Sequence, residues 1–228
     1  MKIKFSTENE AAFELFKPEP VKKHLPEWYK DTPRTDSDPK RVRSYGPNQS
    51  PFTVTSCIPV QDYMMSGYVL LNTSERMIET IPNTDPVDFS DYAPDGRMGY
   101  HRHAQCPVHI GGRKNHYFKL WNPWTISTPK GYSCLFYQPE YLMETRYRLM
   151  PAIVDTDTYV GAVNFPGVLL TDEPFMLKAG APLMVVFPFK RDEWDSEVSF
   201  EKQIKNNKLS VYLHGMYKKV FHQKKVYR

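Results

Sequence analysis

Short runs of alternating apolar and polar residues fill the middle of this 228-residue chain, and they predict β-strands rather than helices. In chain order, the predicted strands lie at 52–60, 67–71, 77–81, 117–120, 124–137, 147–153, 162–165, 168–170, 175–177 and 183–189. The stretch 124–137 contains a Pro-Lys-Gly sequence that predicts a turn between two strands. The last run, 183–189, is apolar throughout, which is typical of a buried central strand. The pattern predicts a mostly-β fold.

The two ends of the chain follow other patterns and suggest three regions. Residues 1–50 contain a polar, proline-containing stretch and are predicted to form an extended N-terminal arm. Residues 51–194 are predicted to form the β domain, with a loop insertion at about 83–116. Residues 195–228 show apolar spacing typical of one or two helices and are predicted to form a basic helical tail.

Composition narrows the class of protein without naming a function. The chain has 20 Pro and 14% aromatic residues, which favours short strands joined by ordered loops, and its formal net charge is a mild +4. Three cysteines, Cys57, Cys106 and Cys134, do not make a disulfide framework. The start of the sequence lacks the apolar core of a signal peptide, and no apolar run reaches the roughly 18 residues of a membrane span. We therefore expect a protein of a reducing, aqueous compartment with no membrane partner.

Four stretches stand out in chain order, and the first two are Ser66-Gly67-Tyr68-Val69-Leu70 and residues 126–131, which lead into a strand. The other two are residues 152–159, Ala-Ile-Val-Asp-Thr-Asp-Thr-Tyr, and Lys178-Ala179-Gly180, a turn before an apolar strand. In this order they resemble the first motif, the approach to the second motif, the third motif and a later turn of the dUTPase and dCTP deaminase superfamily. The resemblance covers about residues 52–190. It implies a β-clip-like, dUTPase-like barrel, and it implies self-association, for example as a trimer.

The departures from those motifs concern the residues that carry the family's chemistry. The resemblance places Val69 where the family has an Asp that helps to hold magnesium, and hydrocarbon cannot bind a cation. It places Gln138-Pro139-Glu140-Tyr141-Leu142 where the family has an Arg-Ser pair for phosphate, so an acid replaces a cation. The C-terminal residues contain no glycine run of the kind that closes over a triphosphate in the family.

The third motif keeps two residues with implied roles. By resemblance, Asp155 stands where the family activates water, and Tyr159 stands where it packs under the sugar. The alternative is that Asp155 and Asp157 are turn residues whose side chains hydrogen-bond to their own backbone. Asp155 is thus a weak catalytic candidate, and Asp155 and Tyr159 are candidate ligand-binding residues.

Four further features spread over the whole chain: Leu25-Pro26-Glu27-Trp28-Tyr29-Lys30, Asn122 to Pro129, Val154-Asp155-Thr156-Asp157, and Phe187-Pro188-Phe189-Lys190-Arg191. With these features the whole chain also resembles an uncharacterised family of tailed-phage proteins. This resemblance implies a phage setting, in the virion or the host cytoplasm, and no known activity.

Residues 101–109 gather three histidines and a cysteine. His101, His103, Cys106 and His109 offer four nitrogen and sulfur ligands, the set that zinc prefers. On a strand, His101 and His103 would share one face. The spacing matches no standard zinc module, and histidines in loops beside a sheet are common, so metal binding and an ordinary loop both remain open.

A second possibility for this stretch is a small-molecule pocket. His101, His103 and Gln105 would line it together with Asp155. No nucleophile elbow, phosphate-cradling glycine loop or His-Glu-x-x-His motif accompanies these residues.

Three hypotheses for function follow, and the first is favoured. The chain is a non-catalytic phage protein, a virion structural or assembly component that binds copies of itself and other phage particle proteins. The second hypothesis is a protein that binds a nucleotide or another small ligand. The third is a divergent nucleotide hydrolase with Asp155 as its base.

Overall fold

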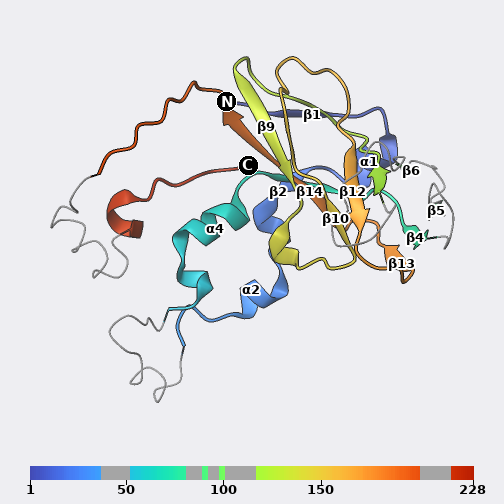
Figure 1. Cartoon of the computed structure of the whole chain (residues 1–228), viewed down its shortest axis with the longest axis horizontal. Helices are drawn as coiled ribbons and strands as arrows, with labels where there is room; N and C mark the ends of the chain where they lie inside the picture. Colours follow the sequence, from blue (N-terminus) through green and yellow to red (C-terminus); the bar gives the residue numbers. More distant parts are fainter. Residues whose placement is uncertain (37–51, 81–88, 92–97, 101–116, 201–216) are drawn as a thin grey trace. The chain divides into compact units, whose positions relative to one another are not determined.

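The computed structural model describes residues 1–36, 52–80, 89–91, 98–100, 117–200 and 217–228 (Figure 1). The chain divides into two compact units. The first consists of Met1–His24 and Gly67–Arg191, and the second consists of Leu25–Ser66 and Asp192–Arg228. The first unit contains every β-strand among the described residues, and the fold is mostly β, as the alternating pattern predicts.

A five-stranded antiparallel sheet forms the centre of the first unit. Its order is β11 (Ala152–Val154), β9 (Tyr132–Tyr137), β14 (Pro182–Lys190), β3 (Tyr68–Leu71) and β2 (Glu19–Pro20). The apolar strand β14 lies between β9 and β3 and pairs with both, so the prediction of a buried central strand is confirmed.

Three smaller antiparallel sheets complete this unit. A four-stranded sheet has the order β10 (Tyr147–Leu149), β12 (Phe165–Leu169), β7 (Tyr117–Leu120) and β6 (Met98–Tyr100). A three-stranded sheet has the order β13 (Phe175–Leu177), β4 (Arg76–Thr80) and β5 (Phe89–Asp91). The N-terminal strand β1 (Lys4–Ser6) pairs with β8 (Thr125–Ser127). Residues 147–153, expected to form one strand, therefore supply two strands that belong to different sheets.

The apolar core fills the space between these sheets. Val186 of β14 pairs with Phe136 of β9, and Phe136 pairs on its other side with Ala152 of β11. The three side chains therefore lie on one face of the five-stranded sheet. Val186 and Phe136 are almost completely buried and pack with side chains from β7, β10 and β12, among them Phe118 and Leu149. Burial of this apolar area is the main stabilising contribution to the unit.

The second unit contains short helices. They are α2 (Glu27–Asp31), the 3-10 turn η2 (Val54–Ser56), α4 (Ile58–Met65) and a five-residue π-helical turn η6 (Tyr217–Phe221). Another 3-10 turn, η5 (Glu140–Leu142), and the helices α1 (Glu10–Leu15) and η1 (Val21–His24) belong to the first unit. No helix in the described part of the chain is long and apolar enough to cross a membrane.

The strand predicted at 52–60 is wrong, because these residues form η2 and the start of α4. Pro59 stands in the first turn of α4, where a missing N–H costs nothing. The Gln61 side chain joins the two helices by donating to the carbonyl oxygen of Thr55 at 2.6 Å. Phe52 and Val54 are 45% and 39% exposed, so the alternation does not mark a buried face.

Residues 195–228 were predicted to form a helical tail, and among the described residues of this stretch only Tyr217–Phe221 are helical. Residues 192–200 form neither helix nor strand, so the prediction is wrong at Val198. Within 217–228, helical structure is confined to Tyr217–Phe221. Residues 201–216, which carry most of the predicted helical spacing, lie outside the described residues.

Candidate functional site

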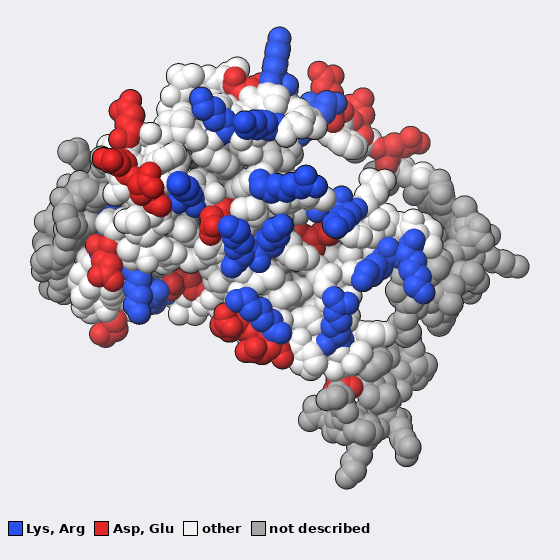
Figure 2. All heavy atoms as spheres, turned by 180° about the vertical axis from the view of Figure 1, so that it is seen from behind, with Lys and Arg blue, Asp and Glu red and all other residues white. Residues whose placement is uncertain are grey.

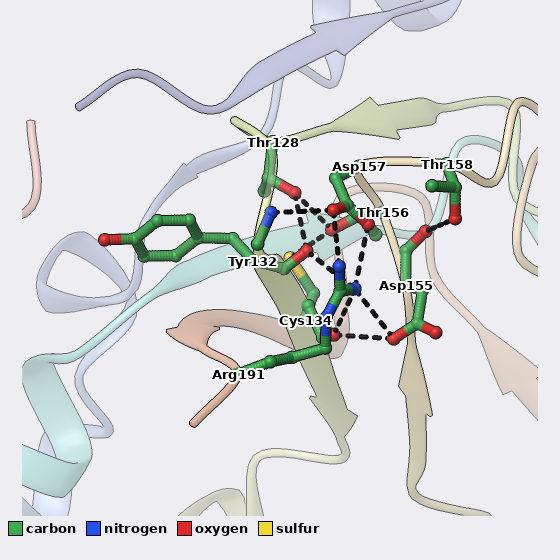
Figure 3. Close-up of polar contacts among 10 residues, drawn as sticks. Thr128, Tyr132, Cys134, Asp155, Thr156, Asp157, Thr158 and Arg191 are labelled. Atoms are coloured by element: carbon green, nitrogen blue, oxygen red, sulfur yellow. Dashed lines mark hydrogen bonds and ion pairs between the residues drawn. The ribbon is translucent and has the colours of Figure 1, made fainter. Parts of the chain in front are cut away.

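A polar cluster lies where three strands of the first unit end (Figure 3). Asp155, Thr156 and Asp157 follow β11 directly, Ser133 belongs to β9, and Arg191 follows the last residue of β14. The chain turns sharply after β11, because the backbone N–H groups of Thr158 and Tyr159 both donate to the carbonyl oxygen of Asp155, and the Thr158 hydroxyl donates to it as well. The turn places the Asp155 and Asp157 side chains beside Arg191.

Arg191 and Asp157 form a two-pronged ion pair. The distance from Nη1 to Oδ1 is 2.8 Å and that from Nη2 to Oδ2 is 2.5 Å. Asp157 Oδ2 also accepts the backbone N–H of Gly131 at 2.8 Å. The Asp157 side chain is only 2% exposed. The hydrogen bonds from Arg191, followed by the one from Gly131, lower the pKa of Asp157 to about 2, so this carboxylate is ionised at any physiological pH.

Asp155 meets the same arginine from the other side. Its Oδ1 accepts the Ser133 hydroxyl at 2.6 Å and lies 3.1 Å from Arg191 Nη1. Its side chain is 61% exposed. The Ser133 hydrogen bond and then the Arg191 hydrogen bond lower the pKa of Asp155. A general base works best with a pKa near the working pH, so these partners make Asp155 a weaker base than a free carboxylate.

A threonine pair continues the cluster toward the core. The Thr128 and Thr156 hydroxyl oxygens lie 2.8 Å apart, and the Thr156 hydroxyl donates to Cys134 Sγ at 3.3 Å. Cys134 is completely buried, and burial raises the pKa of its thiol. A protonated, inaccessible thiol cannot act as a nucleophile, so Cys134 is a core residue here.

Tyr159, the second residue carried by the third motif, lies at the end of the same turn. Its side chain is turned back on its own loop, with its hydroxyl 3.4 Å from the carbonyl oxygen of Ala162 and its ring against Gly161. The residue is 47% exposed. Its role in holding a sugar stays a prediction.

The two positions where family chemistry was expected to be lost lie on different elements of the β unit. Val69 is 1% exposed in β3 and pairs with Val185 of β14. It offers no oxygen ligand, so the side chain at the position that the resemblance assigns to magnesium does not fit that ion. Glu140 is exposed at the start of η5. Among the described residues, no group of three His, Cys, Asp or Glu side chains is placed to hold a metal.

The predicted zinc ligands His101, His103, Cys106 and His109 lie outside the described residues, and so does Gln105. The metal site therefore stays a prediction. The pocket that His101, His103 and Gln105 were expected to form with Asp155 stays a prediction as well.

Sequence reasoning singled out Asp155 but not its partners Ser133 and Arg191. Ser133 is separated from Asp155 by 22 residues, and only the pairing of β9 with β11 brings them together. The sequence did contain a signal for Arg191. Three of the stretches on which the resemblance to phage proteins rests each supply residues to this cluster, and they are 122–129, 154–157 and 187–191.

A separate cavity of about 220 Å³ lies elsewhere in the β unit. Its polar lining comes from Gln138, Glu144, Arg146 and Lys178. Arg146 holds Glu144 through Nε–Oε1 and Nη2–Oε2 contacts of 2.8 and 2.7 Å. Burial raises the pKa of Glu144, but the Arg146 hydrogen bonds outweigh it and lower that pKa overall. Glu144 and Arg146 neutralise each other, so Lys178 gives the lining a net positive charge.

Comparison with known proteins gives a structural similarity at low identity. No family model and no curated protein matches the chain. The dUTPase of EIAV is 9% identical, with 61% of this chain and 87% of that chain covered and a TM-score of 0.36. A variant dUTPase of the S. aureus phage phi11 is 11% identical, with 61% and 83% covered and a TM-score of 0.35. A variant dUTPase of Staphylococcus bacteriophage 80alpha, solved with dUpNHpp, is 11% identical, with 62% and 80% covered and a TM-score of 0.33. The chain is thus similar to these three dUTPase structures at TM-scores of 0.36 or less.

Proposed function

We propose that this chain is a non-catalytic, self-associating component of a phage particle, built on a degenerate dUTPase-like fold. One observation carries the proposal: the carboxylate of Asp155, the candidate base, is held by the Ser133 hydroxyl and the Arg191 guanidinium. Both partners favour the ionised form, and Asp155 has a lowered pKa.

The rest of the cluster supports a structural role for these residues. Both terminal nitrogens of Arg191 bond to Asp157, whose side chain is buried. A guanidinium committed to a buried carboxylate is not free to bind a phosphate. The cluster therefore serves to join strand ends rather than to bind or cleave a nucleotide.

The setting and the oligomer belong to the proposal as well. The sequence stretches that resemble tailed-phage proteins support a phage particle, and three of them contribute to the polar cluster. We expect assembly with other copies of the chain, for example as a trimer, and with other particle proteins, in the virion or in the host cytoplasm before packaging.

The decisive test combines the protein composition of phage particles with an assay of nucleotide turnover. Mass spectrometry of gradient-purified particles should find the chain at a fixed ratio to the major capsid protein. Purified protein incubated with dUTP, dCTP and the other nucleoside triphosphates should release no more product than the Asp155→Asn variant. Turnover that Asp155→Asn abolishes, with the fold intact by circular dichroism, would overturn the proposal in favour of a hydrolase.

A second candidate function is binding of a small ligand, favoured by the cavity lined by Gln138, Glu144, Arg146 and Lys178. Its positive lining suits a nucleotide or another small anion. Thermal-shift measurements with individual nucleotides should then show stabilisation of the wild type but not of Lys178→Ala, with no product formed. Stabilisation that is equal in both proteins would argue against this cavity as the site.

A further inference from the structure

Residues 192–200, here named the acidic segment, leave the β unit as an extended stretch without helix or strand (Figure 1). The segment contains four acidic residues and no Lys or Arg. It also exposes three large apolar side chains, those of Trp194, Val198 and Phe200, which are 87%, 97% and 97% exposed. Apolar side chains of this size are rarely left in water together unless they meet a partner.

The order of residues in the acidic segment is that of an amphipathic strand. Trp194, Val198 and Phe200 stand at even positions, and Glu193, Asp195 and Glu197 stand at odd positions. In an extended chain, even and odd side chains point to opposite sides. The segment can therefore present an apolar face and an acidic face at once.

The end of the chain has the opposite charge. Residues 217–228, here named the basic tail, contain five Lys or Arg and no acidic residue. The tail also exposes apolar side chains, with Val220, Phe221 and Val226 at 61%, 55% and 56%. Both signs of charge occur on the face that Figure 2 presents, where Lys and Arg gather in the middle and Asp and Glu lie mostly toward the edges.

Asp62 of α4 holds the basic tail in place. Its Oδ1 lies 3.1 Å from His222 Nε2, and its Oδ2 lies 2.6 Å from Lys225 Nζ. Burial raises the pKa of Asp62, but the hydrogen bonds from Lys225 and His222 lower it overall, so the carboxylate stays ionised near neutral pH. This anchorage leaves Lys218, Lys219 and Lys224 exposed, and none of them forms an ion pair with another described residue.

We infer that the acidic segment of one copy docks on the basic tail of a second copy. The two segments match in charge, and both expose apolar side chains that the contact would bury. Within a single chain the apolar side chains of the acidic segment are not covered, because Trp194, Val198 and Phe200 remain almost fully exposed. Four carboxylates would be repelled by nucleic acid and by an anionic membrane, so neither is the occupant.

This contact is heterologous, because it joins two different surfaces. A contact of this type closes into a ring, such as a trimer, or continues as a filament. The inference rests on the proposed self-association and names the surface that produces it. The attraction depends on charge, so raised salt should weaken it.

Charge reversal of either partner tests the inference on the full-length protein. The segment variant carries Glu193→Lys, Asp195→Lys and Glu197→Lys. The tail variant carries Lys218→Glu, Lys219→Glu and Lys224→Glu. All six side chains are exposed, so both variants should fold, which circular dichroism will check. In sedimentation-velocity runs, each variant alone should be monomeric, and an equimolar mixture should associate, because each supplies a partner for the other.

A matched control changes the same charge elsewhere. Glu8→Lys, Glu14→Lys and Glu173→Lys reverse three exposed acids of the first unit and should leave association unchanged. A further variant, Trp194→Ala with Phe200→Ala, keeps every charge and should weaken association at least tenfold.

The outcomes separate this inference from the proposed function. If both charge-reversed variants still associate like the wild type, or if their mixture stays monomeric, the segment–tail contact is overturned while self-association stands. If the wild type is itself monomeric at every concentration tested, both the contact and the self-association fail.

Discussion

Arg191 and Asp157 form an ion pair that reaches across a strand. Arg191 follows β14 and Asp157 follows β11, and β9 lies between these two strands in the sheet. The pair therefore joins two strands that share no backbone hydrogen bonds. Its third partner, the Gly131 N–H, belongs to the turn that enters β9, so one carboxylate connects three chain segments.

Loss of the Asp157 carboxylate should destabilise the fold more than loss of Asp155. Asp157→Asn leaves a nearly buried amide facing a guanidinium, whereas Asp155 is largely exposed. Scanning calorimetry should show a clear fall in Tm for Asp157→Asn and a smaller fall for Asp155→Asn. Equal falls would mean that the two carboxylates contribute alike.

A double-mutant cycle can isolate the ion pair itself. Arg191→Met and Asp157→Asn should each lower Tm, and the combined variant should lose less than the sum of the two. Additive losses would show that the two residues act independently.

The ion pair also predicts how stability depends on pH. The pKa of Asp157 is lowered from 3.8 to about 2, so the unfolded chain takes up this proton first as pH falls. The contribution of Asp157 is complete above its ordinary pKa and is lost as pH falls through about 2. Denaturant unfolding of wild type and Asp157→Asn should therefore differ by a constant amount above pH ~4 and converge toward pH ~2. A difference that persists unchanged below pH ~2 would contradict this reading.

Gly67 and Gly131 allow the cost of a positive φ to be separated from the cost of a steric clash, because both have positive φ and only one is crowded. Both have positive φ, +90° and +87°, but a Cβ at Gly67 would lie 2.6 Å from the carbonyl oxygen of Val186, whereas one at Gly131 would meet nothing within 4 Å. Gly131→Ala should cost about 1 kcal/mol, and Gly67→Ala about 2–4 kcal/mol, because the second also displaces backbone of the central strand. Urea unfolding measures both, and equal losses would show that only φ matters.

The two described cysteines should differ in reactivity. Cys57 is exposed, whereas Cys134 is fully buried with its thiol pKa raised by burial. Brief alkylation of the native protein, followed by peptide mass spectrometry, should label Cys57 and leave Cys134 unlabelled. Unfolding in urea should make Cys134 label as well, and rapid labelling without urea would show that the core around β9 opens.

The sequence predicted the strands where alternation and burial coincide. The apolar run at 183–189 and the turn within 124–137 both appear as expected, because buried apolar faces and a Pro-Lys-Gly turn are local signals. The prediction failed at 52–60, where alternation is present but the apolar side chains of Phe52 and Val54 stay exposed. In this stretch the β-propensity of the residues does not decide the structure, and a helix begins just before Pro59.

The candidate site was predictable only in part. Asp155 stands in a motif and lies in a turn, but its side chain bonds Ser133 and Arg191, whereas the turn alternative placed that side chain on its own backbone. Ser133 and Arg191 are distant in sequence, and pairing of β9 with β11 and with β14 decides that they meet Asp155. Such a meeting depends on strand order, which no local pattern encodes.

The position of β14 has a consequence for how the protein is made. It is the last strand in the described part of the chain, yet it lies between β9 and β3, which precede it by about 50 and 110 residues. Until β14 leaves the ribosome, the inner edges of β9 and β3 have no partner, so the sheet cannot form during most of synthesis. Folding therefore waits for nearly the whole β unit and depends on distant contacts, which makes it slow and exposes the nascent chain to aggregation. Chains truncated before residue 182 should accumulate as insoluble protein or be degraded.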